Sequence, residues 1–137
     1  MKRVYVKEEI CMGCRLCEVY CRVEHSPSRD LVKAFKQDTP APVARVRVET
    51  RSPVSFSVRC QHCREPYCVY ACLTGALSRD PDSGAVVVDD EKCVGCWTCL
   101  LTCPYGSIAR DTARGKSAKC DLCPNAEAPV CVANCPN

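Results

Sequence analysis

One stretch of sequence decides the fold: Cys93-Val94-Gly95-Cys96-Trp97-Thr98-Cys99-Leu100-Leu101-Thr102-Cys103-Pro104. Its spacing is C-x2-C-x2-C-x3-C followed by proline, and the rest of the chain holds three related groups. The four groups are Cys11, Cys14, Cys17 and Cys21; Cys60, Cys63, Cys68 and Cys72; Cys93, Cys96, Cys99 and Cys103; and Cys120, Cys123, Cys131 and Cys135. They account for all sixteen cysteines, so none is left over.

Cysteine dominates the composition. A chain of 137 residues fits one compact domain or two very small modules, and cysteine makes up about 12% of it. Without cysteine, the apolar fraction of 47% falls to about 35%, which is thin for a chain this short. Disulfides or metal must therefore hold the fold together.

The N-terminal sequence favours metal. Residues 1–10 contain no apolar leader, no cleavage site and no twin-arginine signal. No stretch approaches the ~18 uncharged apolar residues that a membrane span needs. We therefore expect a cytoplasmic protein without a membrane span, in a reducing compartment where clustered cysteines usually bind metal.

The spacing predicts four [4Fe–4S] clusters. The first and third groups match the C-x2-C-x2-C-x3-C run of two-cluster ferredoxins. Three cysteines two residues apart let a loop wrap one cubane, and Gly13 and Gly95 permit left-handed dihedrals and a close approach to it. Zinc is the main alternative, but structural zinc sites use cysteine pairs separated by a dozen or more residues. Disulfides are less suitable still, because cysteines this close together are poorly placed to pair.

Cluster binding also changes the charge. The formal net charge is +3, but four cubanes with their thiolates add about −8 and leave the oxidised holoprotein near −5. The basic residues are scattered and no nucleic-acid-binding motif accompanies them, so we expect no nucleic-acid partner.

The x3 spacing aims the last cysteine of a run about one helical turn on, at a different cluster. If every group follows this rule, and the second group pairs with the third and the first with the fourth, the cysteines form four crossed ligand sets. These are set 1, Cys11, Cys14, Cys17 and Cys135; set 2, Cys120, Cys123, Cys131 and Cys21; set 3, Cys60, Cys63, Cys68 and Cys103; and set 4, Cys93, Cys96, Cys99 and Cys72.

An internal repeat predicts the domain organisation. Residues 75–80 after the second group match residues 106–111 after the third. Two strand–loop–helix–strand half-units would thus form a central two-cluster ferredoxin-like module over residues 54–113. The first and fourth groups then have only each other, which predicts a split outer module, residues 1–53 plus 114–137, with the central module inserted into it. The repeat supports the central module directly, whereas the nesting follows from pairing logic.

Regular structure between the groups is expected to be short. Residues 28–36 are predicted to form a helix capped by Ser28. Residues 43–49 and 54–58 alternate like two strands around a turn, and residues 85–88 form a third strand. The expected fold class is α+β, with two ferredoxin-like modules, one inserted within the other.

With these motifs, the sequence resembles the four-cluster polyferredoxin electron-transfer subunits found with carbon monoxide dehydrogenase, formate hydrogenlyase and the dimethyl sulfoxide reductase type of molybdenum or tungsten enzyme. The resemblance covers about residues 4–136. Besides the cysteine groups, it rests on Gln61-His62-Cys63-Arg64-Glu65-Pro66 and Cys103-Pro104-Tyr105-Gly106-Ser107-Ile108. Residues 21–26 look closest to the carbon monoxide dehydrogenase-associated branch. In a departure from simple ferredoxins, Cys21 and Cys72 are not followed by proline.

The resemblance implies the inserted ferredoxin fold, the crossed ligand sets and a role as an electron relay. The implied partners are a larger catalytic metalloenzyme subunit (carbon monoxide dehydrogenase, a molybdenum or tungsten-pterin enzyme, or a hydrogenase) and, as a further candidate, a flavin-containing NAD(P)H-linked subunit. Because the sequence is short, we expect the chain to lack the C-terminal extensions that larger members use for docking.

No residue is arranged to transform a substrate. Every cysteine is assigned as a ligand, and the sequence offers no nucleophile–base pair and no glycine-rich phosphate loop. We therefore expect a non-catalytic electron-transfer subunit. The alternative is a free-standing polyferredoxin, or a structural or sensor iron–sulfur protein without a fixed partner. For His62, packing or a hydrogen bond to a cluster sulfide is expected, because sixteen cysteines already satisfy four cubanes.

Overall fold

The computed structural model describes residues 3–137, which contain five short helices and six short strands. In chain order these are α1 Leu16–Glu24, α2 Leu31–Lys36, β1 Val46–Arg51, β2 Val54–Arg59, α3 Tyr67–Tyr70, β3 Leu77–Arg79, β4 Val86–Val88, α4 Thr98–Thr102, β5 Ala109–Asp111, β6 Lys116–Ala118 and α5 Val130–Ala133. This mixture confirms the α+β class. None of the helices within residues 3–137 has the length and apolar character required to cross a membrane.

The strands form three separate hairpins. Each sheet has two antiparallel strands that are neighbours in sequence, β1 with β2, β3 with β4 and β5 with β6. In the longest hairpin Val46 lies opposite Arg59 and Arg51 lies opposite Val54, so the turn falls where it was predicted. Its first strand begins and ends later than the predicted 43–49, and the strand predicted over 85–88 begins at Val86.

The predicted start of the α2 helix was wrong. The helix begins at Leu31, and Asp30 rather than Ser28 is its N-cap, because the Asp30 carboxylate accepts hydrogen bonds from the first-turn amides of Val32 and Lys33 at 3.0 and 2.9 Å. Arg29 has a left-handed backbone with φ 49°, and this conformation prevents the helix from extending back to Ser28.

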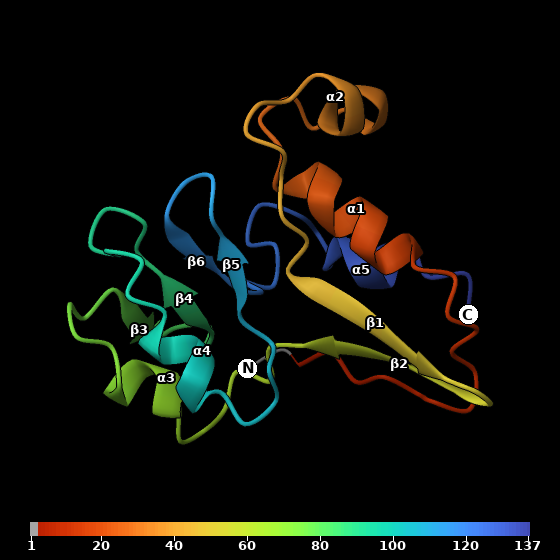
Figure 1. Ribbon diagram of the computed structural model, residues 1–137. Coiled ribbons are helices and arrows are strands. Elements are labelled where there is room, and N and C mark those ends of the chain that lie inside the picture. Colours follow the sequence, from red (N-terminus) through yellow and green to blue (C-terminus); the bar gives the residue numbers. More distant parts are fainter. Residues whose placement is uncertain (1–2) are drawn as a thin grey trace.

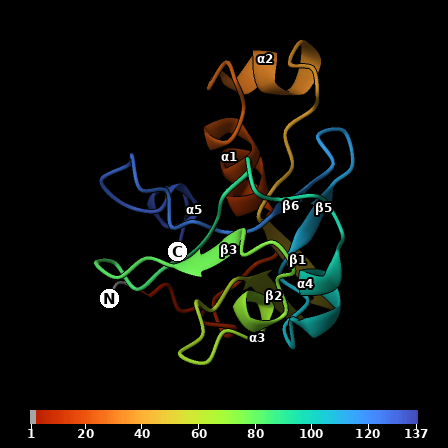
Figure 2. The ribbon, with the colours of Figure 1, turned by 90° about the vertical axis from the view of Figure 1, so that its left-hand side faces the viewer.

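The helices pack in pairs that bring distant segments together (Figure 1). Helix α1, near the start of the sequence, packs against α5, near its end, and α3 packs against α4. The view turned by 90° shows the same two pairs on different sides of the molecule (Figure 2). Helices α1 and α5 carry cysteines of the first and fourth groups, and α3 and α4 carry cysteines of the second and third.

The apolar core is small. Its buried centre consists of Leu77, Val86, Cys99 and Ile108, with further cysteines packed around it. Large apolar side chains elsewhere stay exposed, including Leu101 at 86% and Leu73 at 77%. The thin apolar core expected from the composition therefore describes this fold, and cysteines contribute to its contacts.

Two loop glycines allow neighbouring hairpins to approach the cysteine loops. Gly13 and Gly95 have φ of +70° and +69°, as predicted. A Cβ atom on Gly95 would lie 2.3 Å from the carbonyl oxygen of Gly115, in the β5–β6 turn, and one on Gly13 would lie 2.8 Å from Oγ of Ser55. Glycine is therefore required at both positions by close contacts within the protein, in addition to any approach to a cluster. The contact is with backbone at Gly95 and with a side chain at Gly13.

We predict that Gly95→Ala destabilises the protein more than Gly75→Ala. Gly75 has a similar φ of +66° but no atom within 4 Å of its Cβ position, so alanine there costs only the left-handed strain of about 1–2 kcal/mol. At Gly95 the same strain is joined by a clash with the β5–β6 turn. Guanidinium unfolding of anaerobically prepared protein, followed by circular dichroism, measures the difference. Equal midpoints for the two variants would contradict the proposed contact.

Candidate metal centres

The second and third cysteine groups share two small pockets in crossed fashion. One pocket is lined by Cys60, Cys63, Cys68 and Cys103, together with the core residues Val86 and Ile108. The other is lined by Cys72, Cys93, Cys96 and Cys99, together with Leu77 and Val88. In each pocket, three thiols come from one group and the fourth comes from the other.

Short helices produce this crossing. Cys68 lies within α3 and Cys72 follows its end, whereas Cys99 lies within α4 and Cys103 directly follows it. At Cys103 the backbone leaves the helix for an extended conformation, with φ −77° and ψ 111°. Because α3 and α4 pack against each other, the cysteine that ends each helix lies in the pocket of the opposite loop.

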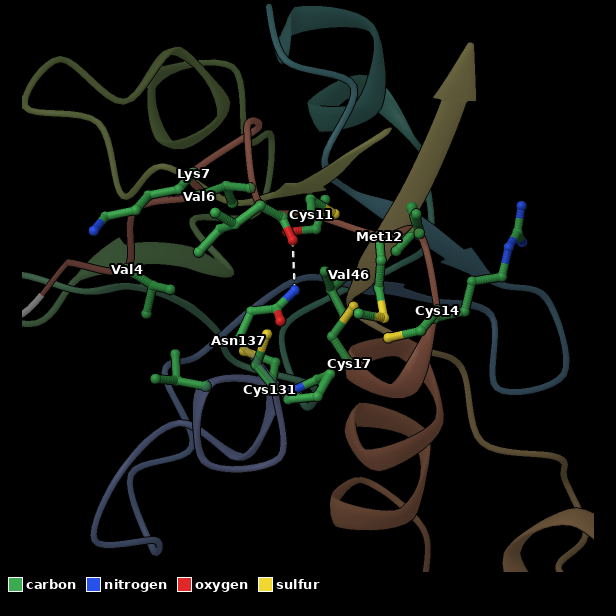
Figure 3. A pocket seen from close by; sticks show the side chains of 18 of the residues that line it. Val4, Val6, Lys7, Cys11, Met12, Cys14, Cys17, Val46, Cys131 and Asn137 are labelled. Carbon is green, nitrogen blue, oxygen red and sulfur yellow. Dashed lines mark hydrogen bonds between the residues drawn. The ribbon is translucent and has the colours of Figure 1, made fainter. Parts of the chain in front are cut away.

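A larger cavity, of about 330 Å³, lies between the first loop of the chain and its C-terminal segment. Figure 3 shows Cys11, Cys14, Cys17 and Cys131 among its lining residues. Cys135 also lines the cavity. The side-chain amide of Asn137 donates a hydrogen bond to the carbonyl oxygen of Ile10 and so ties the two terminal segments together beside it.

The remaining thiols gather around Cys21. Burial raises the pKa of the Cys21 thiol to about 12; the backbone N–H of Arg45, which donates to its Sγ at 3.1 Å, opposes the shift, while Cys120, Cys123 and Cys131 add to it. Buried thiols this close together resist ionisation, since their negative charges would repel one another. A bound cationic metal centre removes that obstacle.

A polar network holds Cys21 against the fourth cysteine group. The Asp121 carboxylate accepts from Nη1 of Arg45 at 2.7 Å and from the backbone N–H of Cys123 at 3.0 Å, and Nε2 of His25 lies 3.2 Å away. Nδ1 of His25 lies 2.7 Å from the carbonyl oxygen of Cys21. Burial opposes ionisation of Asp121, but these contacts hold the pKa of its carboxyl well below the usual range.

His25 is the C-cap residue of α1, and only 12% of its side chain is exposed. The sequence alone does not indicate its link to Asp121. Ligand atoms of His25, Asp121 and Cys123 lie within 4.8 Å of one another. The Arg45 guanidinium on the same carboxylate disfavours an additional cation there.

The surroundings of His62 fit an anionic, hydrogen-bond-accepting group. His62 is only 1% exposed, and burial together with Lys119 and Arg59 lowers its pKa to about 4, so that the ring is neutral at pH 7. Its Nδ1 accepts from the N–H of Val86 at 3.0 Å, which leaves the proton on Nε2. Within residues 3–137 that buried Nε2 has no partner. Cluster sulfides and thiolates are acceptors of the required kind.

The buried cations support the same assignment. Arg59 and Lys119 are 3% and 2% exposed, and within residues 3–137 neither forms an ion pair with a carboxylate. An uncompensated buried charge costs several kcal/mol. Iron–sulfur clusters bound by four thiolates carry the negative charge that would compensate these cations.

Comparison with known proteins agrees with the chemistry of these sites. A family model described as a 4Fe–4S dicluster domain matches residues 53–137. Electron transport protein HydN of Escherichia coli (strain K12) is 37% identical over 92% of this chain and 78% of its own length. The thiosulfate reductase electron transfer subunit PhsB of Salmonella typhi is 33% identical over 94% of this chain and 68% of its own. The aliphatic sulfonate oxidoreductase, polyferredoxin-like subunit of Pyrococcus furiosus is 36% identical over 96% and 70%.

We predict that Asp121→Asn weakens the attachment of α1 to the fourth cysteine group. The asparagine side chain keeps an acceptor for the Cys123 N–H but loses the negative charge that holds Arg45 and His25. A hydrogen bond to a charged group contributes about 1.5–3 kcal/mol to stability. Iron retained after anaerobic gel filtration in dilute guanidinium should fall, whereas Asp82→Asn, in an exposed turn, should retain the wild-type amount. Equal retention by the two variants would show that the network does not hold this site.

Proposed function

The chain belongs to the 4Fe–4S dicluster family of iron–sulfur electron-transfer proteins, and from this we propose that it relays single electrons through four [4Fe–4S] clusters. The relay would connect a metal-containing catalytic oxidoreductase subunit with another redox partner. The crossed lining of the two small pockets, each with three thiols from one group and one from the other, is the observation that carries the proposal.

We assign one cluster to each of the four sets predicted from the spacing. Sets 3 and 4 correspond to the two small pockets. The thiols of set 1 line the large cavity, and in set 2 the thiols of Cys120, Cys123 and Cys131 all help to raise the pKa of Cys21. Cys131 belongs to set 2 but also lines the large cavity, where it would separate two neighbouring clusters.

The chain's own residues would bind the iron and limit the access of water. When bound, a [4Fe–4S] cluster supplies one-electron redox chemistry, with a potential set by net charge, hydrogen bonds to sulfur and solvent exposure. Backbone N–H groups already point at thiols, as in the hydrogen bonds from Arg45 to Cys21 and from His62 to Cys60. Such donors favour the more negative, reduced state.

Contacts between the sets support a linear order. Cys131 of set 2 and Cys17 of set 1 line the same cavity, and Lys119 bonds to the carbonyl oxygens of Cys120 in set 2 and of Val86, which lines the set 3 pocket. Sets 3 and 4 are joined by the packing of α3 against α4. We infer the order set 1, set 2, set 3, set 4. The exposed cysteines, Cys14, Cys135 and Cys96, all lie in the two end sets, where redox partners would have access.

The nested arrangement of two modules remains our proposal for the domain organisation. Packing of α1 against α5 and of α3 against α4 supports an outer and a central unit. Both predicted boundaries, at 53/54 and 113/114, fall in the turns of hairpins, because β2 pairs with β1 and β6 pairs with β5. These two hairpins would therefore join the units, and each unit would contribute one strand to each hairpin.

The relatives support a subunit role. Two of them are named as subunits, of a thiosulfate reductase and of an aliphatic sulfonate oxidoreductase, and none of the three is named as the catalytic component. We propose a cytoplasmic complex with a catalytic metalloenzyme subunit, of the carbon monoxide dehydrogenase, molybdenum or tungsten-pterin, or hydrogenase type, and with a flavin-containing NAD(P)H-linked subunit as a candidate second partner. A free-standing polyferredoxin is the alternative.

Anaerobic purification from the native source should yield about sixteen iron and sixteen sulfide per chain, with broad absorption near 400 nm, because four cubanes contain that many atoms. A large catalytic chain should co-purify. Metal and sulfide analysis and identification of the bound chains test both statements on one sample. A colourless, zinc-loaded protein would refute cluster binding, and a brown protein without a partner chain would favour the free-standing alternative.

Double variants test the crossed ligation. If Cys72 and Cys96 serve one cluster, replacing both with alanine damages one cluster and leaves three intact; ligation within each group would leave two. The control pair Cys72 and Cys63 reverses the expectation, with two intact clusters for crossed ligation and three for ligation within groups. Mössbauer spectroscopy counts intact [4Fe–4S] clusters directly, and the same count for both pairs would contradict our assignment.

A further inference from the structure

A buried junction lies between set 2 and set 3, the two inner sets of the proposed relay. Arg59, at the end of β2, and Lys119, just beyond β6, each precede the first cysteine of a group. The Arg59 guanidinium donates to the carbonyl oxygen of Cys60 at 3.4 Å, and Nζ of Lys119 donates to the carbonyl oxygen of Cys120 at 2.9 Å and to that of Val86. Both cations are thus anchored to the backbone.

The charges of both side chains act on the inner sets. Arg59 bonds to the carbonyl oxygen of Cys60 in set 3, and it lines the large cavity beside Cys131 of set 2 and the thiols of set 1. Nζ of Lys119 bonds to the carbonyl oxygen of Cys120 in set 2 and to that of Val86, which lines the pocket of set 3. Each cation therefore acts on both inner sets at once.

The exposed cysteines all belong to the two outer sets, although Cys93 and Cys99 of set 4 are buried. No cysteine of set 2 or set 3 is exposed, whereas set 1 and set 4 contain the three exposed cysteines. Burial disfavours added negative charge, so burial alone would make the inner clusters harder to reduce. Fixed positive charge in a low-dielectric setting has the opposite effect, and it acts more strongly there than in water.

Lys92 provides an internal comparison. It precedes Cys93, the first cysteine of the third group, just as Lys119 precedes Cys120. However, the Lys92 side chain is 63% exposed and forms an ion pair with Asp89 at 3.0 Å. Its charge is screened by water and already neutralised by a carboxylate. Among residues 3–137, the same local position thus holds a buried cation without a carboxylate partner beside the inner sets, and an exposed cation with such a partner beside set 4.

We propose that Arg59 and Lys119 act on the electron relay through their buried charges. These charges raise the reduction potentials of the two inner clusters. The two cations oppose the lowering of the reduction potential that burial of these clusters causes. Electrons can therefore cross the junction between the two units. This inference rests on the proposed function, since it requires clusters in set 2 and set 3.

The test is a redox titration of anaerobically purified protein, followed by electron paramagnetic resonance. Each glutamine variant, Arg59→Gln and Lys119→Gln, should lower the equilibrium constant for reduction of the inner clusters at least tenfold, or ~59 mV for a one-electron couple. Arg59→Lys should retain most of the equilibrium constant that Arg59→Gln loses. Lys92→Gln should change the equilibrium constant for reduction of every cluster by less than threefold. Unchanged potentials in fully loaded glutamine variants, or an equal fall in Lys92→Gln, would overturn the proposal.

Iron analysis separates this proposal from the relay itself. A wild-type protein with far fewer than four clusters would refute the proposed function, whereas full loading with unchanged potentials in the variants would refute only the role of the cations. Both glutamine variants could instead lose iron. A loss confined to about half of the sixteen atoms, together with full loading of Arg59→Lys and Lys119→Arg, would support a need for charge at the junction. A uniform loss, or a loss in the charge-retaining variants as well, would assign both residues to packing and overturn the proposal.

Discussion

Thiols from distant parts of the sequence must meet in the same small spaces, and the rest of the structure depends on this constraint. Cys21 reaches Cys120, Cys123 and Cys131 across most of the chain, at a considerable cost in loop-closure entropy. The apolar core cannot supply this free energy alone, since its buried cluster around Leu77 and Val86 contains only a few side chains. Because crowded, buried thiols also resist ionisation, cluster binding and folding would be a single event in this chain.

The sequence predicts what depends on local spacing and misses what depends on tertiary contact. Cysteine grouping, the left-handed glycines Gly13 and Gly95, the α+β class and the β1–β2 turn follow from short-range patterns. The Asp30 cap was missed because a left-handed Arg29 excludes Ser28 from the helix. Asp121 was missed because its partners His25 and Arg45 are remote in sequence.

Lys92 and Lys119 illustrate the same limit within one motif. Both stand directly before the first cysteine of a group, so local sequence treats them alike. The β5–β6 hairpin leads Lys119 into the interior, where it bonds to the carbonyl oxygen of Val86, whereas Lys92 follows an exposed turn and pairs with Asp89. A cation's electrostatic effect on a neighbouring site depends on burial and on its partners, and neither can be read from spacing.

Solvent protection and ease of reduction impose opposite demands on a relay of this kind. Its ends must be exposed to partners, as Cys14 and Cys96 are, and water there stabilises added negative charge. Its interior must be closed to water, which removes that stabilisation. An electron passing from end to end would then meet its least favourable position in the middle. Fixed cations such as Arg59 and Lys119 replace the missing solvent without admitting it, and the negative clusters in turn make the burial of those cations tolerable. Each side of this arrangement therefore requires the other.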